Sequence, residues 1–391
     1  MHAARSLADA GTARYEGGKS PAALVAGTRK KECFAMAQQV ASAPLPPATG
    51  PAEVASHALA GSPEQRPFRS PRHTYGALDL GTNNCRLLIA RPAEDGFVVI
   101  DAFSRVVRLG EGLAGSGRIA DAAMDRAVAA LSVCAEKLKR RHVSLARSVA
   151  TEACRRAVNG RHFVERVRRE TGICLEIIAP EEEARLAMLG CHRLLEPGDA
   201  PALIFDIGGG STELILIDTD AEGTPKIKCW WSAPWGVVSL TESEGRDFAN
   251  ADERLAAYGR MKERVRHAFR RFAELLPPRE GNIRLLGTSG TVTTLASVHL
   301  ALPSYDRRAV DGLMMPVDKM RAVNHMLSRM SFAERSALPC IGAERADLVV
   351  AGCAILEAIM DIWPAQTLGV ADRGIREGIL RSLMAKDGHK L

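Results

Sequence analysis

The chain has 391 residues, enough for two or three domains of about 100–200 residues each. Apolar residues make up 46% and charged residues 25%, which allows a large buried core and excludes a wholly disordered chain. No stretch approaches the ~18 consecutive apolar residues of a membrane span, and residues 1–72 hold four of the six net positive charges. We therefore expect a soluble protein with no membrane or nucleic-acid partner.

The nine cysteines indicate a reducing compartment. They form no CxxC pair and no Cys/His spacing typical of a zinc site. An odd number of cysteines scattered through apolar runs is typical of buried, reduced thiols. We therefore expect a cytoplasmic protein without structural zinc.

Residues 1–73 differ in composition from the rest of the chain. They are rich in Ala with scattered basic residues, then rich in Pro over 44–71, and show no sustained apolar periodicity. Such a segment cannot bury enough apolar surface to fold alone, so we expect a disordered N-terminal extension. The remaining chain is expected to form one lobe over 74–196 and a second over 197–391, with the C-terminal helix a candidate to pack back on the first lobe.

From Tyr75 onward, strand and helix patterns alternate. A helix is expected over 120–140, because Met124, Val128 and Leu131 recur at spacings of three and four. This alternation predicts an α/β fold. The other expected elements are strands at 76–80, 85–90, 97–105, 146–150, 174–178, 202–206, 213–218 and 367–370, helices around 161–170, from 181, and at about 346–361 and 373–384, and a strand, glycine loop and helix over 283–295.

The opening strand–turn–strand pattern returns 127 residues later. Aligned on Asp79 and Asp206, the segments DLGTNNCRLLIA and DIGGGSTELILI share the aspartate, a glycine and a following apolar strand. The shared context indicates an internal duplication. It predicts two α/β lobes of similar plan with a cleft between them.

The later turn, DIGGGSTE over 206–213, is suited to binding phosphate. A plain hairpin needs only one or two glycines, whereas three in a row let successive backbone N–H groups approach an anion. The carboxylates of Asp206 and Glu213 are suited to hold hydrated Mg²⁺ or to orient a water. The candidate phosphate ligands of this turn are Gly208, Gly209, Gly210, Ser211 and Thr212.

Two further glycine turns add to this pattern. In DLGTNNCR (79–86), Asp79 is again a candidate metal ligand, and GTSGTVTT (287–294) leads into a helix N-terminus, where anions are favoured. The chain has no GxxxxGK[ST] motif, which excludes a P-loop, and no complete GxGxxG signature with its acidic partner, which disfavours dinucleotide binding. The candidate phosphate ligands of these two turns are Gly81, Thr82, Asn83, Asn84, Gly287, Ser289 and Gly290.

Six motifs in order carry a resemblance to a known family. Together they resemble the Ppx/GppA phosphatases, which are exopolyphosphatases and guanosine-pentaphosphate phosphohydrolases of the actin-like, sugar-kinase-like ATPase superfamily. The resemblance covers most of the chain from Gly76 onward, and it is to the short form that lacks an extra C-terminal helical domain. It implies two actin-like lobes, of the sugar-kinase and heat-shock ATPase type, with an interlobe cleft. The motifs are DLGTNNCR (79–86), ATEACRRA (150–157), EIIAPEEEARL (176–186), LIFDIGGGSTEL (203–214), LGTSGTVTTLA (286–296) and ADRGIREGIL (371–380).

The resemblance implies that an activated water attacks a terminal phosphoryl group and releases orthophosphate. The family's general base is the second Glu of an E-E-A-R segment, which is Glu183 here. Without the resemblance, Glu181, Glu182 and Glu183 are equivalent acids at a helix start. The resemblance also implies that Arg155 is a phosphate ligand, with Arg156 the competing choice.

Two substrates fit this resemblance. The leading expectation is an exopolyphosphatase acting on linear polyphosphate with Mg²⁺, and the alternative is a pppGpp 5′-phosphohydrolase that gives ppGpp. Thr82 and Asn84 stand where the family commonly has serines, so the sequence leaves the choice open. A kinase is disfavoured by the water-activating glutamate, and a catalytically weak alarmone-binding regulator by the complete set of site residues. The resemblance makes a homodimer the expected assembly.

Overall fold

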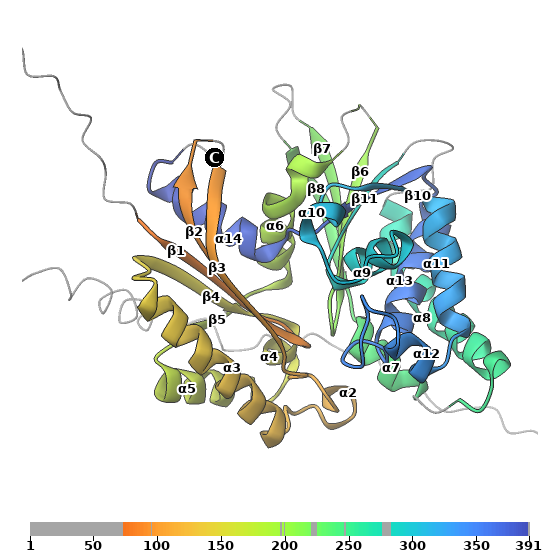
Figure 1. Ribbon diagram of the computed structural model, residues 1–391, viewed down its shortest axis with the longest axis horizontal. Coiled ribbons are helices and arrows are strands. Elements are labelled where there is room, and N and C mark those ends of the chain that lie inside the picture. The colour runs from red at the N-terminus through yellow and green to blue at the C-terminus, as the bar shows by residue number, and fades with distance from the viewer. Residues whose placement is uncertain are drawn as a thin grey trace, which may run out of the picture. The chain divides into compact units, whose positions relative to one another are not determined.

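The computed structural model describes residues 73–94, 96–195, 198, 200–219, 225–245, 248–275 and 283–389. Apart from His73, the extension predicted for 1–73 lies outside these described residues. The described chain contains two mixed sheets, each covered by its own helices (Figure 1). None of the helices in these ranges is both long enough and apolar enough to cross a bilayer.

The first sheet has five strands in the order β3–β2–β1–β4–β5. β1, β2 and β3 pair antiparallel, whereas β4 and β5 join β1 in parallel. The apolar face predicted for the 120–140 helix is buried: its residues Met124, Val128 and Leu131 all lie in the core of this lobe. The elements are β1 (Tyr75–Leu80), β2 (Asn84–Ala93), β3 (Gly96–Val106), α2 (Leu113–Ser116), α3 (Asp121–Arg140), β4 (Leu145–Ala150), α4 (Glu152–Arg156), α5 (Gly160–Thr171) and β5 (Leu175–Ile177).

The second sheet has six strands in the order β10–β11–β9–β6–β7–β8. Its core is the largest of the described chain and includes an edge-to-face contact of Phe272 with Trp363, with ring centroids 5.8 Å apart. The elements are β6 (Ala202–Ile207), β7 (Thr212–Thr219), β8 (Pro225–Ala233), α7 (Val237–Glu244), α8 (Ala251–Leu275), β9 (Arg284–Thr288), α9 (Gly290–His299), α10 (Arg307–Val310), β10 (Met314–Pro316), α11 (Val317–Arg329), α12 (Phe332–Ser336), α13 (Val349–Ile362) and β11 (Thr367–Ala371).

The two sheets repeat one plan. The series β3–β2–β1–β4–β5 matches β8–β7–β6–β9–β11 in order and in strand direction. The register repeats as well, because Asp79 lies opposite Arg86 in the first hairpin and Asp206 lies opposite Glu213 in the second. The duplicated plan predicted from the sequence is confirmed.

Two helices, α6 (Pro180–Cys191, followed by the 3₁₀ turn η1, His192–Leu194) and α14 (Ile375–Lys386), lie between the two sheets (Figure 1). They share a core with β1, β2, β6 and β7. Their backbones are in close contact: a Cβ atom at Gly378 would lie 2.0 Å from the carbonyl oxygen of Leu186, and one at Gly190 would lie 2.0 Å from that of Gly374. The glycines therefore set how closely α6 approaches α14, and with it where the start of α6 meets the cleft.

Candidate active site

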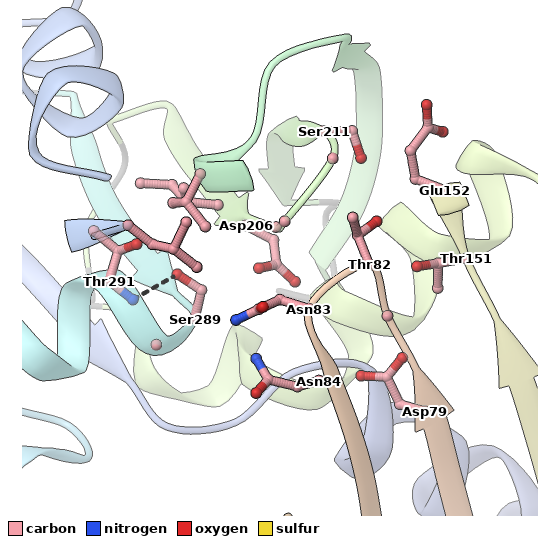
Figure 2. A pocket seen from close by; sticks show the side chains of 18 of the residues that line it. Asp79, Thr82, Asn83, Asn84, Thr151, Glu152, Asp206, Ser211, Ser289 and Thr291 are labelled. Atoms are coloured by element: carbon pink, nitrogen blue, oxygen red, sulfur yellow. Dashed lines mark hydrogen bonds between the residues drawn. The ribbon is translucent and has the colours of Figure 1, made fainter. Parts of the chain in front are cut away.

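A pocket of about 140 Å³ lies where three glycine turns meet the first residues of α4 and α6. In Figure 2, Asp206 and Asn83 point into the same space, with Ser289 and Thr291 on one side and Asp79 on the other. Most of the residues singled out from the sequence line this pocket. They are Asp79, Gly81, Thr82, Asn83, Asn84, Glu183, Asp206, Gly208, Gly209, Gly210, Ser211, Glu213, Ser289 and Gly290.

Three predicted site residues do not line the pocket. Thr212 is fully buried and donates its hydroxyl hydrogen bond to the carbonyl of Trp235 (2.7 Å). Gly287 lies inside β9, where a Cβ atom would meet the ring of Phe205 at 2.7 Å. Arg155 lies behind Glu183 and contacts it. The structure thus places Thr212 and Gly287 in the packing of the second lobe and outside the pocket lining, and their phosphate contacts stay predictions.

Other pocket residues were not among the predicted site residues. Arg86 and Glu152 belong to recognised motifs, and their side chains reach the pocket from β2 and α4. Arg345 and Val349 come from a stretch outside the recognised motifs, so the sequence analysis did not single them out. The full additional set is Arg86, Thr151, Glu152, Ile207, Val237, Thr291, Thr294, Arg345, Leu348, Val349 and Ile375.

The two hairpin turns are closed in the same way. The N–H of Gly81 donates to the carbonyl of Asn84, and the N–H of Gly208 donates to that of Ser211, each at 2.9 Å. Each turn thus ends at the same place relative to its aspartate. The duplication therefore places two equivalent polar turns at the two sides of one pocket.

The glycine run lets these turns touch. A Cβ atom at Gly209 would lie 2.8 Å from the Cβ of Thr82, and one at Gly210 would lie 2.9 Å from both the Thr82 hydroxyl oxygen and the Cγ of Glu152. The carbonyl groups of Gly208 and Gly209 also accept hydrogen bonds from the first N–H groups of α7, at 2.9 and 2.8 Å. The run is therefore needed for the close approach of the two turns across the pocket.

Glu183 is a buried carboxylate at the start of α6, with 6% of its surface exposed. Its Oε2 accepts a hydrogen bond from Arg155 (3.0 Å), and the same guanidinium donates to Glu152 (2.8 Å) and to the carbonyl of Ile178 (2.8 Å). Burial raises the pKa of Glu183 well above its usual range, and the charge of Glu213 adds to this, while Arg155 opposes it. A buried carboxylate with a raised pKa is suited to accept a proton.

The structure distinguishes the three glutamates at the start of α6. Glu182 forms ion pairs with Arg147 (2.6 Å) and Arg185 (2.7 Å), and the hydrogen bond from Arg185 is the main cause that lowers its pKa to about 2. Glu181 is exposed on the surface. Of the three, Glu183 alone lines the pocket.

Three further carboxyl groups line the pocket, and burial disfavours the charged form of each. The pKa of Asp206 is raised to about 8, mainly by burial and then by the charge of Glu213. Burial also raises the pKa of Asp79, whose Oδ1 has no hydrogen-bond partner. Burial raises the pKa of Glu213 as well. Ser211 and Ser232 each donate a hydrogen bond to its Oε1 at 2.8 Å, and these two bonds oppose the rise.

These carboxyl groups do not form a complete metal-coordination site by themselves. Within the described ranges, no three His, Cys, Asp or Glu side chains converge closely enough to hold an ion by themselves. Asp79, Asp206 and Glu213, the predicted metal ligands, line one pocket as separate carboxyl groups, and their binding of a metal stays a prediction. Mg²⁺ commonly binds through one or two carboxylates and completes its shell with water and phosphate oxygens, so the arrangement remains suited to it.

Comparison with known proteins shows which family this chain belongs to. The model of the Ppx/GppA phosphatase family matches residues 88–387. Exopolyphosphatase 2 of Mycobacterium tuberculosis is 32% identical over 321 residues, which cover 78% of this chain and 97% of that protein. The crystal structure of the Aquifex aeolicus Ppx/GppA family member matches with a TM-score of 0.67 at 28% identity, over 82% of this chain and 100% of that chain.

A crystal structure of an exopolyphosphatase from Cytophaga hutchinsonii matches with a TM-score of 0.70 at 24% identity, over 81% of this chain and 99% of that chain, and supports the fold alone. The fold class predicted from the sequence, α/β with two actin-like lobes, is confirmed. Because the family match spans most of the chain, the chain belongs to the Ppx/GppA phosphatase family of phosphoanhydride hydrolases.

Proposed function

We propose that this chain is an exopolyphosphatase, which hydrolyses the terminal phosphoanhydride bond of linear polyphosphate with water activated by Glu183. The observation that carries the proposal is the placement of Glu183, a buried carboxylate with a raised pKa that faces a pocket walled by glycine turns. The similarity to Exopolyphosphatase 2 supports polyphosphate as the substrate.

In the proposed reaction, the turns hold the terminal phosphoryl group and Glu183 orients a water against it. Glu183 takes a proton from this water as the new P–O bond forms, the bond to the bridging oxygen breaks, and orthophosphate leaves. The shortened polyphosphate carries away the electron pair of the broken bond on its terminal oxygen. Backbone N–H groups and the hydroxyls of Thr82 and Ser211 donate to the phosphoryl oxygens as their charge rearranges.

The role of Arg155 follows from its contacts. Its guanidinium bridges Glu183 and Glu152 and also donates to a backbone carbonyl. Three bonds on one rigid, planar group fix the orientation of the glutamate that they hold. We therefore assign Arg155 as a positioning residue for Glu183, in place of the direct phosphate contact predicted from the sequence.

Mg²⁺ fits this pocket. Asp79 has a buried oxygen without a partner, and the pKa values of Asp79, Asp206 and Glu213 are all raised. A divalent cation among these side chains would relieve their repulsion and let them ionise. Asp79 and Asp206 would hold the ion, with Glu213 beside them, and the ion would supply charge neutralisation to the phosphates when bound.

The alternative substrate is pppGpp. Its support is the apolar part of the pocket wall, where Val237, Leu348, Val349 and Ile375 offer a surface for a purine base. Polyphosphate makes no use of such a surface. Purified full chain with Mg²⁺ should be given inorganic polyphosphate and pppGpp separately, and released orthophosphate measured. Faster release from polyphosphate supports the proposal, and faster release from pppGpp favours the alternative.

The general base is tested by Glu183→Gln. The change keeps the shape of the side chain and removes the proton acceptor, so kcat should fall by roughly 10²–10⁴-fold. Glu182→Gln is the matched control, since it removes the same charge one residue earlier in α6, and it should cost less than about tenfold. Equal losses in both variants would point to a change in helix stability and would contradict the assignment of the base.

A further inference from the structure

A second cavity, of about 850 Å³, lies among the helices of the second lobe. Helices α7, α8, α12 and α13, which lie close together in Figure 1, form most of its wall, and Arg108 reaches it from the first lobe. None of the described residues lines both this cavity and the active-site pocket. Small-molecule sites commonly measure about 300–1,000 Å³, so the cavity has room for an organic molecule larger than a phosphate group.

Part of the cavity wall is apolar and includes aromatic side chains. Tyr258 and Met261 line the cavity from α8, and Phe332 lines it from α12. Phe332 is 49% exposed, so a flat apolar group placed against it would remove apolar surface from water. This part of the wall suits the flat, apolar portion of a ligand.

The same cavity is lined by guanidinium groups that have no carboxylate partner. Arg335 is 8% exposed, and its Nε donates to the carbonyl of Ala346 at 2.7 Å. The Nε of Arg254 donates to the carbonyl of Arg329 at 2.9 Å. Within the described ranges, neither Arg254 nor Arg335 forms an ion pair with an acidic side chain. A charge removed from water without a counter-ion is costly, so an anion that both groups contact would stabilise them.

The carboxylates of the cavity wall already have partners. Asp347 accepts the ion pair of Arg108 at 2.9 Å, and Glu253 accepts a hydrogen bond from the N–H of Ala249 at 2.8 Å. The chain's own segment 1–72 carries four of the six net positive charges, so its charge does not complement two further cations. The complementary occupant is therefore an anion from outside the chain.

One wall of the cavity is also a wall of the active-site pocket. In the segment 343–350, Asp347 and Val350 line the cavity, whereas Leu348 and Val349 line the pocket. A ligand that displaces Asp347 therefore acts on a segment that shapes the active site.

Arg108 supplies a second connection between the two spaces. Its guanidinium crosses to Asp347 in the other lobe, and its backbone N–H donates to the carbonyl of Asn83, in the first glycine turn, at 3.0 Å. Its φ of 48° is in the left-handed region, which non-glycine residues seldom adopt and which is retained only where the surroundings hold it. The ion pair therefore joins the phosphate-binding turn of the first lobe to the cavity wall of the second.

We propose that this cavity is an inhibitory site for a small organic anion with a flat apolar part. The acidic group of the ligand contacts Arg254 and Arg335, and the flat part lies against Phe332. The anion competes with Asp347 for Arg108, which weakens the contact between the lobes and lowers the affinity of the pocket for phosphate. Because Arg108 is free for the ligand only when it releases Asp347, the ligand favours the state with the weaker contact. The inhibition rests on the proposed function, whereas binding in the cavity does not.

Binding is tested with anilinonaphthalene sulfonate, a flat aromatic anion that is fluorescent in apolar surroundings. Full chain is titrated with this probe. Arg254→Gln should raise its Kd by roughly tenfold, the worth of one charge-assisted contact, and Phe332→Ala should raise it by about threefold or more. Arg270→Gln, which removes the same charge from an exposed position later in α8, is the control and should leave Kd unchanged.

The connection to the active site is tested without turnover. Full chain carrying Glu183→Gln, with Mg²⁺, is titrated calorimetrically with inorganic tripolyphosphate, with and without saturating probe. The probe should raise the Kd of tripolyphosphate by about threefold or more, and tripolyphosphate should raise the Kd of the probe by the same factor. Arg108→Ala should remove this mutual effect, because the ion pair is then already absent.

Unchanged probe binding in both Arg254→Gln and Phe332→Ala overturns the site, as do equal losses in Arg254→Gln and Arg270→Gln. A mutual effect that persists in Arg108→Ala shows direct competition in the pocket and overturns the inhibitory mechanism, as does the absence of any mutual effect. Thermal unfolding of each variant identifies misfolding, and Arg254→Lys, which keeps the charge and should lose less affinity than Arg254→Gln, supplies a second measurement. A chain that binds the probe through Arg254 and does not bind tripolyphosphate would contradict the proposed function and leave the site standing.

Discussion

Asp206→Asn should stabilise the ligand-free protein at alkaline pH while it abolishes most activity. Asp206 is buried, its pKa is raised from 3.8 to about 8, and it lies opposite Glu213 across the hairpin. A group with a raised folded-state pKa binds more protons in the folded chain than in the unfolded one. Its contribution to stability is therefore complete below about pH 4 and is lost as the pH rises toward 8.

The size of this effect follows from the shift. Each pH unit between the two pKa values changes the free energy of unfolding by about 1.4 kcal/mol. Between pH 5 and pH 8 the wild type should lose up to about 4 kcal/mol that the asparagine variant, which does not ionise, retains. The stabilisation by Asp206→Asn should therefore grow with pH by about 2–4 kcal/mol over that range.

Urea unfolding at pH 5, 6.5 and 8 measures this difference, in buffers without phosphate and with a chelator. Asp252→Asn, an exposed change at the start of α8, is the control and should stay within about 0.5 kcal/mol of wild type at each pH. Added Mg²⁺ should stabilise the wild type more than the variant. A gain from Asp206→Asn that is independent of pH, or one that shrinks as the pH rises, would refute the reasoning.

Two further predictions concern the contacts that hold the pocket together. Gly378→Ala places a methyl group against the backbone of Leu186, so it should force α14 away from α6 and lower the free energy of unfolding by about 1–3 kcal/mol, measured by urea unfolding. Arg108→Ala removes the 2.9 Å ion pair to Asp347 between the lobes; it should raise KM for polyphosphate with kcat nearly unchanged, and alter stability by less than about 1 kcal/mol.

The repeated hairpin was predictable because its signal is local. Alternating apolar residues give the strands, a glycine turn closes each hairpin, and the aspartate marks the same register position in both copies. The closing hydrogen bonds of the two turns have the same length, which follows from that shared pattern. The domain boundaries, the homodimer and the cytoplasmic location stay predictions.

Helix α8 was not predicted, although its sequence carries a signal. Its core residues Ala257, Met261, Val265, Phe269 and Phe272 recur every three or four positions. The rest of the helix is strongly charged, so the apolar stripe is narrow and the average hydropathy is low. A stripe of this kind becomes a helix when other elements cover it, and its main partner here is helix α13, which comes from another part of the chain.

In the site, too, some features follow from neighbouring residues in the sequence, and others depend on residues far along the chain. Thr212 and Glu213 are neighbours in a strand and must therefore point to opposite faces, so the sequence could have separated the buried hydroxyl from the pocket carboxylate. The roles of Glu182 and Glu183 depend instead on which arginines they meet. Arg185 lies in the same helix as Glu182, but Arg147 and Arg155 lie elsewhere in the chain, and the fold decides those two pairings.

The asymmetry of the pocket traces to one register position of the duplicated hairpin. The residue opposite the turn aspartate that both copies share is Arg86 in the first copy and Glu213 in the second. A second glutamate in place of Arg86 would add a buried anion beside Asp79 and Asp206, and would repel a phosphate chain. Because the two copies differ in charge at this position, one side of the pocket carries a guanidinium, and the other carries a carboxylate that adds to the effect of burial in raising the pKa of Glu183. The proposed reaction, which binds a polyanion and activates a water, would use both charges, and the duplicated fold provides them at equivalent positions.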